Sequence, residues 1–254
     1  MRDFLLNKLE CFKDPDFIFD PGLHKYTYHG DVFQSVTQFI GEFHLPFDTE
    51  GKSKKKADDT GFDQDWIKAE WAETNRYANE VGTAVHEWIE YYFKEEWQPL
   101  PTNPDIIHRI NKFNHIFAKQ LYKLEPLKFE LKVFSKKWKK AGTIDSLFIK
   151  DGKLFILDWK TNKKFTDDEH KDGRWQKLLT PFDTFYKNHH NEYSIQLSMY
   201  ACILEEWGFE VAGAYIVYIG PGDEPASVIK CVDMREYIRK YFEKDKLNII
   251  LNDN

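Results

Sequence analysis

Apolar residues recur at every third or fourth position in several stretches of the chain, a spacing that predicts amphipathic helices. The longest such stretch runs from 65 to about 96, and its buried stripe is predicted to contain Val81, Ala84, Val85, Trp88, Ile89, Tyr92 and Phe93. The same spacing predicts helices over 106–124, over 193–207 with Gly208 as the stop, and over 234–251. A shorter helix is predicted from a cap at Ser35 to Phe43.

Runs rich in β-branched and aromatic residues predict strands between these helices. Three of the runs lie close together, at 128–135, 142–150 and 154–160, and Asp151-Gly152 predicts a tight turn between the last two. A further strand is predicted over 212–219 and a small hairpin over 25–33. The polar, lysine-rich stretch 48–62 is predicted to be a loop, and 162–190 to be irregular.

The order of these elements is helix, three strands, helix and strand, which predicts an α/β fold with a mixed central sheet flanked by helices. We expect an N-terminal α/β elaboration in residues 1–80 and a core in 81–254 with an insertion at about 162–190. A chain of 254 residues is long enough for one large domain, so we expect both parts to form one compact domain.

Composition narrows the class of protein. Hydrophobic residues make up 42% of the chain and aromatic residues 17%, which favours a folded protein with a substantial core over a disordered one. No apolar run approaches the roughly 18 residues that span a bilayer, and no leader pattern opens the chain. The three cysteines, Cys11, Cys202 and Cys231, lie far apart, which predicts neither disulfides nor an iron–sulfur cluster and favours a reducing cytoplasm.

The net charge of −6 argues against a protein that coats nucleic acid through bulk electrostatics. Local basic runs remain compatible with a basic groove, although each run alone is typical of a solvated loop or strand end. These runs are Lys52 with Lys54 to Lys56, Lys132 with Lys136, Lys137, Lys139 and Lys140, and Lys163 with Lys164.

Candidate metal-binding and catalytic residues lie on two of the predicted strands. Alternate residues share a face of a strand, so Asp158 and Lys160 are predicted to be neighbours. With a tight turn at Asp151-Gly152, Asp145 lies opposite Asp158, about 5 Å away. Two carboxylates this close repel unless a cation lies between them. Their oxygen ligands suit Mg²⁺ or Mn²⁺, and His86 could complete the site.

Each of these features has a simpler interpretation when taken alone. Asp158 and Lys160 are compatible with an exposed strand end, and His86 with a histidine at the edge of the core. Gln196 and Tyr200, one helical turn apart, fit the polar edge of an amphipathic helix. The metal-site prediction therefore depends on the order, spacing and strand context of the whole set.

That set resembles the RecB-type branch of the PD-(D/E)XK nuclease superfamily, including small phage exonucleases and the mitochondrial genome maintenance exonuclease. The resemblance covers about 81–219, just over half the chain, and rests on five motifs in family order: His86 after Gly82-Thr83, Glu130, Gly142-x-x-Asp145, Asp158-Trp159-Lys160 and Gln196-x-x-x-Tyr200. The lead-in is similar to that of the smaller members through Ser35-Val36-Thr37 and Arg76.

The resemblance implies a restriction-endonuclease-like core and a role for each matching residue. His86, Asp145 and Asp158 would bind one or two Mg²⁺ or Mn²⁺ ions, with the Trp159 carbonyl as a further ligand. Lys160 would orient the attacking water and stabilise the phosphate, supported by Gln196 and Tyr200. The resemblance also implies a set of substrate-facing residues: Glu130, Arg76, Lys163, Gln196 and Tyr200. Glu130 could alternatively lie behind the metal ligands and support them. The family's cluster cysteines are missing, which excludes its iron–sulfur variant.

The resemblance favours a metal-dependent DNA exonuclease of recombination, repair or replication that acts in a cytoplasm. Its smaller members imply a phage-encoded protein, which would act in the cytoplasm of the host. Aromatic residues in 50–80 and 162–190 suit stacking of unpaired bases, which favours single-stranded or frayed ends; the alternative is that they pack these segments onto the core. They are Trp66, Trp71, Tyr77, Trp175, Phe182, Phe185 and Tyr186. A single-strand-binding or annealing protein is an expected partner. Two other functions stay open: a flap or junction endonuclease, and an inactive nucleic-acid-binding protein.

Overall fold

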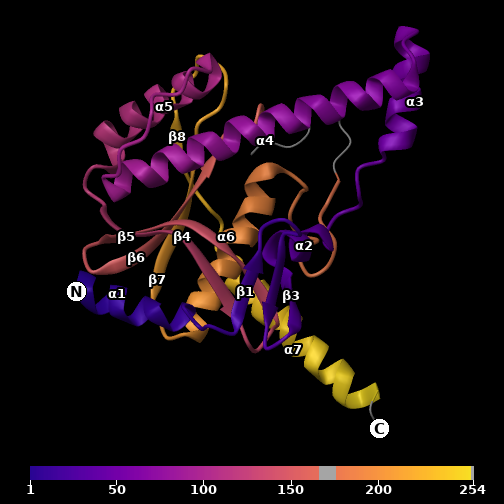
Figure 1. The fold of residues 1–254 in the computed structure, drawn as a ribbon. Helices are drawn as coiled ribbons and strands as arrows, with labels where there is room; N and C mark the ends of the chain where they lie inside the picture. Colours follow the sequence, from indigo (N-terminus) through magenta and orange to yellow (C-terminus); the bar gives the residue numbers. More distant parts are fainter. Residues whose placement is uncertain (166–175, 253–254) are drawn as a thin grey trace.

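The structure is a computed structural model that describes residues 1–165 and 176–252, with side chains described as far as 244. Its centre is a mixed eight-stranded sheet with helices on both sides (Figure 1). The strands follow the order β1-β2-β3-β5-β6-β7-β8, and β4 pairs with β5. The predicted mixed sheet flanked by helices is therefore confirmed.

Three antiparallel strands form the middle of the sheet: β4 (Glu125–Ser135), β5 (Lys140–Lys150) and β6 (Lys153–Lys160). Asp151 and Gly152 connect β5 to β6 with backbone φ values of 51° and 73°. Two successive residues with positive φ match the twist of a two-residue hairpin, which confirms the predicted turn. β7 (Val211–Tyr218) runs parallel to β6, and β8 (Ser227–Lys230), which was not predicted, pairs with β7.

The N-terminal strands extend this sheet. α1 (Arg2–Leu9) and the 3₁₀ turn Glu10–Phe12 lead into β1 (Phe17–Asp20), β2 (Lys25–Tyr28) and β3 (Asp31–Ser35). β2 and β3 form the predicted hairpin, whereas α1 and β1 were not predicted. β3 then pairs in parallel with β5, so the hairpin becomes part of the central sheet.

Helix α2 (Val36–Gly41) follows β3 and begins with a capping box between Ser35 and Gln38, which confirms the predicted cap. The prediction of a loop over 48–62 is wrong, because this stretch contains α3 (Thr49–Thr60). Asp48 caps its first turn, and Gly61, with φ 76°, ends it in the left-handed region. α3 has no apolar stripe, so its capping residues at the two ends are what mark it as a helix.

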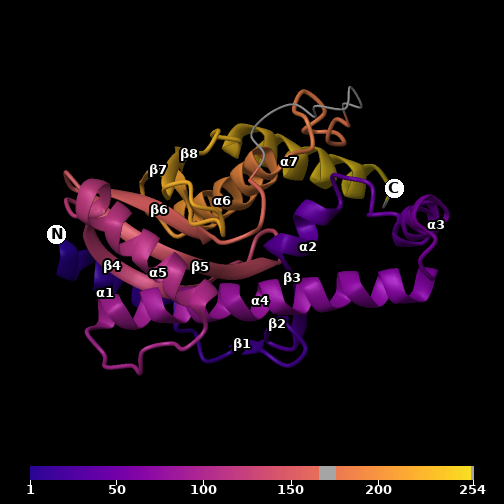
Figure 2. The same ribbon diagram turned by 90° about the horizontal axis from the view of Figure 1, so that it is seen from above.

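Helices form two layers on the sheet. α4 (Gln64–Lys94) and α5 (Pro104–Ile116), which ends in a π-helical turn (Phe117–Leu121), cover one face of the central strands. α6 (His189–Glu206) and α7 (Arg235–Asn252) lie on the other side (Figure 2). All four helices occur where the apolar spacing predicted them. α4 continues through residue 80, so the N-terminal segment and the core share this helix. Within the described residues, no helix has both the length and the apolar content required to cross a membrane.

Candidate functional site

Three acidic side chains lie in a row across the three central strands. Phe129 pairs with Ser146 and Leu131 with Ile144, which places Glu130 beside Asp145. Ser146 pairs with Leu157 on the other side, so the next position of β6, Asp158, also neighbours Asp145. The register agrees with the predicted pairing of Asp145 and Asp158, and it adds Glu130 to the row.

Helix α4 brings His86 to this row. Its Nδ1 atom lies 3.5 Å from Asp145 Oδ2, and ligand atoms of His86, Glu130 and Asp145 all lie within 4.8 Å of one another. Gly82 precedes His86 by one helical turn, and a Cβ atom there would lie 3.1 Å from Thr161 Oγ1. The absent side chain therefore lets α4 lie close to the end of β6.

Asp158 and Lys160 form an ion pair on β6, as their spacing predicts. Lys160 Nζ lies 2.6 Å from Asp158 Oδ2 and donates a hydrogen bond to Gln196 Oε1 at 3.4 Å. Gln196 in turn donates to the Tyr200 hydroxyl at 3.5 Å. Gln196 and Tyr200 thus lie behind the lysine on α6, where they hold it rather than line the open cleft.

The bulky Trp159 fits between Asp158 and Lys160 because its side chain lies on the opposite face of the sheet. The Trp159 side chain is 2% exposed and packs edge-on against Phe113 at 5.6 Å, on the sheet face covered by α4 and α5. Its backbone N–H donates to Asp145 Oδ2 at 2.9 Å. The indole therefore points away from the acids, as the alternation of side chains along a strand requires, while the backbone N–H of Trp159 holds Asp145.

Gly142 makes room for the Tyr200 ring. A Cβ atom on Gly142 would lie 2.7 Å from Tyr200 Cε1, well inside van der Waals contact. Tyr200 is 3% exposed, and its burial strongly raises the pKa of its hydroxyl. This close approach gives a physical reason for the glycine three residues before Asp145.

Burial and repulsion from neighbouring carboxylates act together on Glu130. Burial, together with the charges of Asp145 and Glu90, raises the pKa of Glu130 to about 8. Its backbone has a φ of 47°, a left-handed conformation that is uncommon for a residue other than glycine. Backbone strain and a half-buried acid with a raised pKa are both costs to the fold, and such costs cluster at functional positions.

Asp158 and Lys160 show the same competition between burial and charge. Burial and the neighbouring Asp145 raise the pKa of Asp158, while Lys160 opposes that shift. Burial lowers the pKa of Lys160, but the carboxylates of Asp158 and Asp145 outweigh it, so the net shift is upward. We therefore describe Lys160 as a cation held against a carboxylate.

The residues present fit a divalent cation. Asp145 and Asp158 together carry more negative charge than the adjacent Lys160 balances, and Glu130 adds a third carboxyl group beside them. Within the described residues, the buried Asp158 Oδ2 atom accepts no hydrogen bond of normal geometry, despite its ion pair. Carboxylate oxygens with one imidazole nitrogen can bind Mg²⁺ or Mn²⁺, but this donor set does not by itself select one ion.

The acidic row opens into a cleft of about 950 Å³. α4 forms one wall, the β1–β2 turn contributes His24, and β4 contributes Lys132. Tyr193 of α6 lines the cleft together with Lys160. Sequence reasoning assigned no role to His24 or Tyr193, although Tyr193 precedes Gln196 by three residues and so shares its helix face.

Two predicted substrate contacts lie elsewhere. Arg76 is exposed on α4 and pairs with Glu73 and Glu80 of the same helix, outside the cleft lining. Lys163 is exposed beyond the end of β6 and does not line the cleft. Intrahelical ion pairs thus account for Arg76 without a substrate.

The aromatic residues predicted to form walls divide into two groups. Phe182 is completely buried and packs edge-on against Phe43 at 4.8 Å, and Phe185 packs against the same core, which is the alternative considered above. Trp66 and Tyr77 on α4 are 51% and 42% exposed. Trp175 lies outside the described residues. Among the described residues of these two segments, α4 alone therefore presents predicted aromatics with large exposed surfaces.

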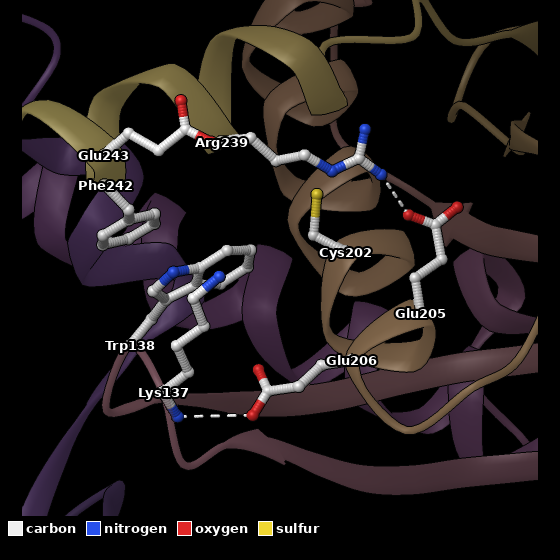
Figure 3. Close-up of a pocket in the computed structure, with 8 residues that line it drawn as sticks. All are labelled: Lys137, Trp138, Cys202, Glu205, Glu206, Arg239, Phe242 and Glu243. Carbon is white, nitrogen blue, oxygen red and sulfur yellow. Dashed lines mark hydrogen bonds and ion pairs between the residues drawn. The ribbon is translucent and has the colours of Figure 1, made fainter.

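A separate cavity of about 240 Å³ lies between the β4–β5 turn, the end of α6 and α7 (Figure 3). Two of its three acids are engaged: Glu205 pairs with Arg239, and Glu206 accepts a hydrogen bond from the backbone of Lys137. None of the predicted site residues lines it. The candidate site therefore lies at the cleft beside Asp145 rather than in this cavity.

Comparison with known proteins assigns no family. No family model matches the sequence, and no curated protein matches it. A similar solved structure, described as the crystal structure of SSO0001, shares 16% sequence identity over 67% of this chain and 70% of that chain. The TM-score is 0.25, a level of similarity that supports no statement about fold or function.

Proposed function

We propose that this protein is a divalent-metal-dependent deoxyribonuclease that hydrolyses phosphodiester bonds, built on a restriction-endonuclease-like core. The single observation that carries the proposal is the row of Glu130, Asp145 and Asp158 beside His86, with Lys160 held against its last member. Acidic ligands and a fixed lysine at one cleft are the groups that phosphoryl-transfer chemistry requires.

Each residue has a distinct task in this proposal. His86, Glu130, Asp145 and Asp158 would hold Mg²⁺ or Mn²⁺, as one or two ions, with the Trp159 carbonyl as a further candidate ligand. A bound ion would supply Lewis-acid chemistry and lower the pKa of water. Lys160 places a positive charge beside the phosphate, where it stabilises the charge that develops as water attacks and the leaving oxygen departs. Gln196 and Tyr200 keep Lys160 in position.

The proposed substrate is DNA with single-stranded or frayed ends, cut as an exonuclease. The cleft draws its walls from α4, the β1–β2 turn and α6, an arrangement that suits a single strand threaded from an end. Lys132 and His24 line the same cleft and can contact backbone phosphates despite the net charge of −6. Because such contacts are few, we expect binding to weaken at high salt.

The experiment compares the wild-type protein with Asp158→Ala on end-labelled single-stranded and duplex oligonucleotides, in Mg²⁺, Mn²⁺ or EDTA. The proposal predicts metal-dependent degradation that is lost in the variant and in EDTA. A covalently closed single-stranded circle tests the exonuclease part, which predicts that the circle survives. Cleavage in EDTA contradicts the metal mechanism, and rapid cutting of the circle contradicts digestion from ends.

Two further results would redirect the proposal. Short internal fragments from flaps or junctions would identify a structure-specific endonuclease. DNA binding without cleavage in either metal would identify an inactive binding protein on the same fold. For an active nuclease we further propose a role in DNA recombination, repair or replication. It would act in a cytoplasm, such as that of a phage's host, with a single-strand-binding or annealing protein as partner.

A further inference from the structure

Tyr193 contacts the lysine of the proposed nuclease site. Lys160 Nζ lies 4.5 Å from the centroid of the Tyr193 ring, within the range of a cation–π contact. Both residues line the cleft. The contact is thus made at the same ammonium group that pairs with Asp158 and donates to Gln196.

The ring is itself held in place by other aromatic groups. It stacks on His189 at 5.9 Å with an interplanar angle of 14°, and Phe165 lies 6.2 Å away at 31°. Tyr193, Gln196 and Tyr200 occupy positions i, i+3 and i+7 of α6, which form one helix face. That face meets Lys160 at its first two positions and Gly142 at the third.

The ion pair with Asp158 and the hydrogen bond to Gln196 hold the Lys160 ammonium, and the Tyr193 ring adds a third restraint. A lysine side chain has four rotatable bonds and a strongly hydrated ammonium group, and the 3.4 Å contact with Gln196 is a long hydrogen bond. A ring face attracts the cation without accepting a proton or consuming one of its three N–H donors. The ammonium therefore keeps a donor available for a phosphate oxygen.

We propose that Tyr193 is a positioning residue that holds the Lys160 ammonium toward the cleft. The role of Lys160 in turnover rests on the proposed function; the contact with Tyr193 does not. No hydrogen bond to the Tyr193 hydroxyl occurs among the described residues, so the ring rather than the phenol is the acting group. Tyr193→Phe keeps the ring, and Tyr193→Leu removes it while retaining apolar volume.

The kinetic test measures kcat and KM of the two variants on a single-stranded oligonucleotide with Mn²⁺. The inference predicts that Tyr193→Leu lowers kcat about tenfold with KM nearly unchanged, and that Tyr193→Phe restores kcat to within about twofold of wild type. A raised KM with unchanged kcat would instead identify a base-stacking residue and overturn the inference. Tyr193→Met replaces the leucine variant if thermal melting shows that the latter is unfolded.

A second readout requires no nuclease activity. Acetic anhydride modifies lysines, and mass spectrometry gives the rate at Lys160. The inference predicts faster modification of Lys160 in Tyr193→Leu than in wild type or Tyr193→Phe, with Lys153 on the same strand as the internal reference. Equal rates in all three proteins overturn it. Faster modification together with a wild-type protein that cleaves no DNA would refute the proposed function and leave the positioning contact intact.

Discussion

Replacing Glu130 by glutamine should stabilise the metal-free protein near neutral pH. The pKa of Glu130 is raised from 4.5 to about 8, so the folded state retains a proton that the unfolded chain releases. Stability is therefore lost as pH rises from about 4.5 towards 8. Glutamine has nearly the same shape, carries no charge at any of these pH values and removes this loss.

The size of the effect follows from the pKa difference. One pKa unit corresponds to about 1.4 kcal/mol, so at pH 7 the raised pKa of Glu130 costs at most about 3 kcal/mol of folding free energy. Glu130 is half-buried, and solvent screening reduces this to on the order of 2 kcal/mol. For a chain of this size, that free energy raises the melting temperature by about 4–8 °C.

Thermal unfolding in EDTA at pH 5 and pH 7.5 measures this difference. Glu130→Gln should melt well above wild type at pH 7.5 and close to it at pH 5. Glu125→Gln is the matched control, because Glu125 begins the same strand but is exposed and pairs only loosely with Arg2 at 3.7 Å; its melting temperature should hardly change. A lower melting temperature for Glu130→Gln at pH 7.5, or the same shift at both pH values, would refute the electrostatic reasoning.

Three other outcomes are expected. Gly142→Ala forces a Cβ atom to 2.7 Å from the Tyr200 ring and should cost about 1–3 kcal/mol; an unchanged urea midpoint would contradict this packing. Trp159→Ala removes a side chain that is 2% exposed and should cost about 3–5 kcal/mol, measured by the same unfolding curve, whereas a small loss would show that the core tolerates the cavity. Mn²⁺ should raise the melting temperature of wild type but much less that of His86→Ala, and equal shifts would exclude His86 as a ligand.

Much of the core fold was accessible from the sequence because its signals are local. The stripe of α4 and the Asp151-Gly152 turn are patterns within a few residues, and both predicted the observed elements. β1 and β8 are four residues each and depend on pairing with distant strands, which periodicity does not reveal. α3 lacks an apolar stripe, but the pair Asp48 and Gly61 at its ends was a signal that could have predicted it.

The candidate site was predictable where residue identity and strand alternation determine position. Asp145, Asp158 and Lys160 meet as the hairpin register requires. Glu130 was assigned a substrate-facing or supporting role, whereas the structure places it within the cluster of potential ligand atoms. Its left-handed backbone and the pairing of its neighbours Phe129 and Leu131 with β5 set that position, and neither follows from local sequence. Arg76 shows the converse, because neighbouring acids on its own helix engage it.

The most direct test of the proposed function is cleavage of an end-labelled single strand in Mn²⁺ by wild type and Lys160→Met, with Mn²⁺ affinity of both proteins measured by titration calorimetry. Lys160→Met keeps the acidic row and His86, so the account predicts that both proteins bind Mn²⁺ while only wild type releases labelled nucleotides efficiently. Equal cleavage by both proteins, or no Mn²⁺ binding to wild type, would contradict it.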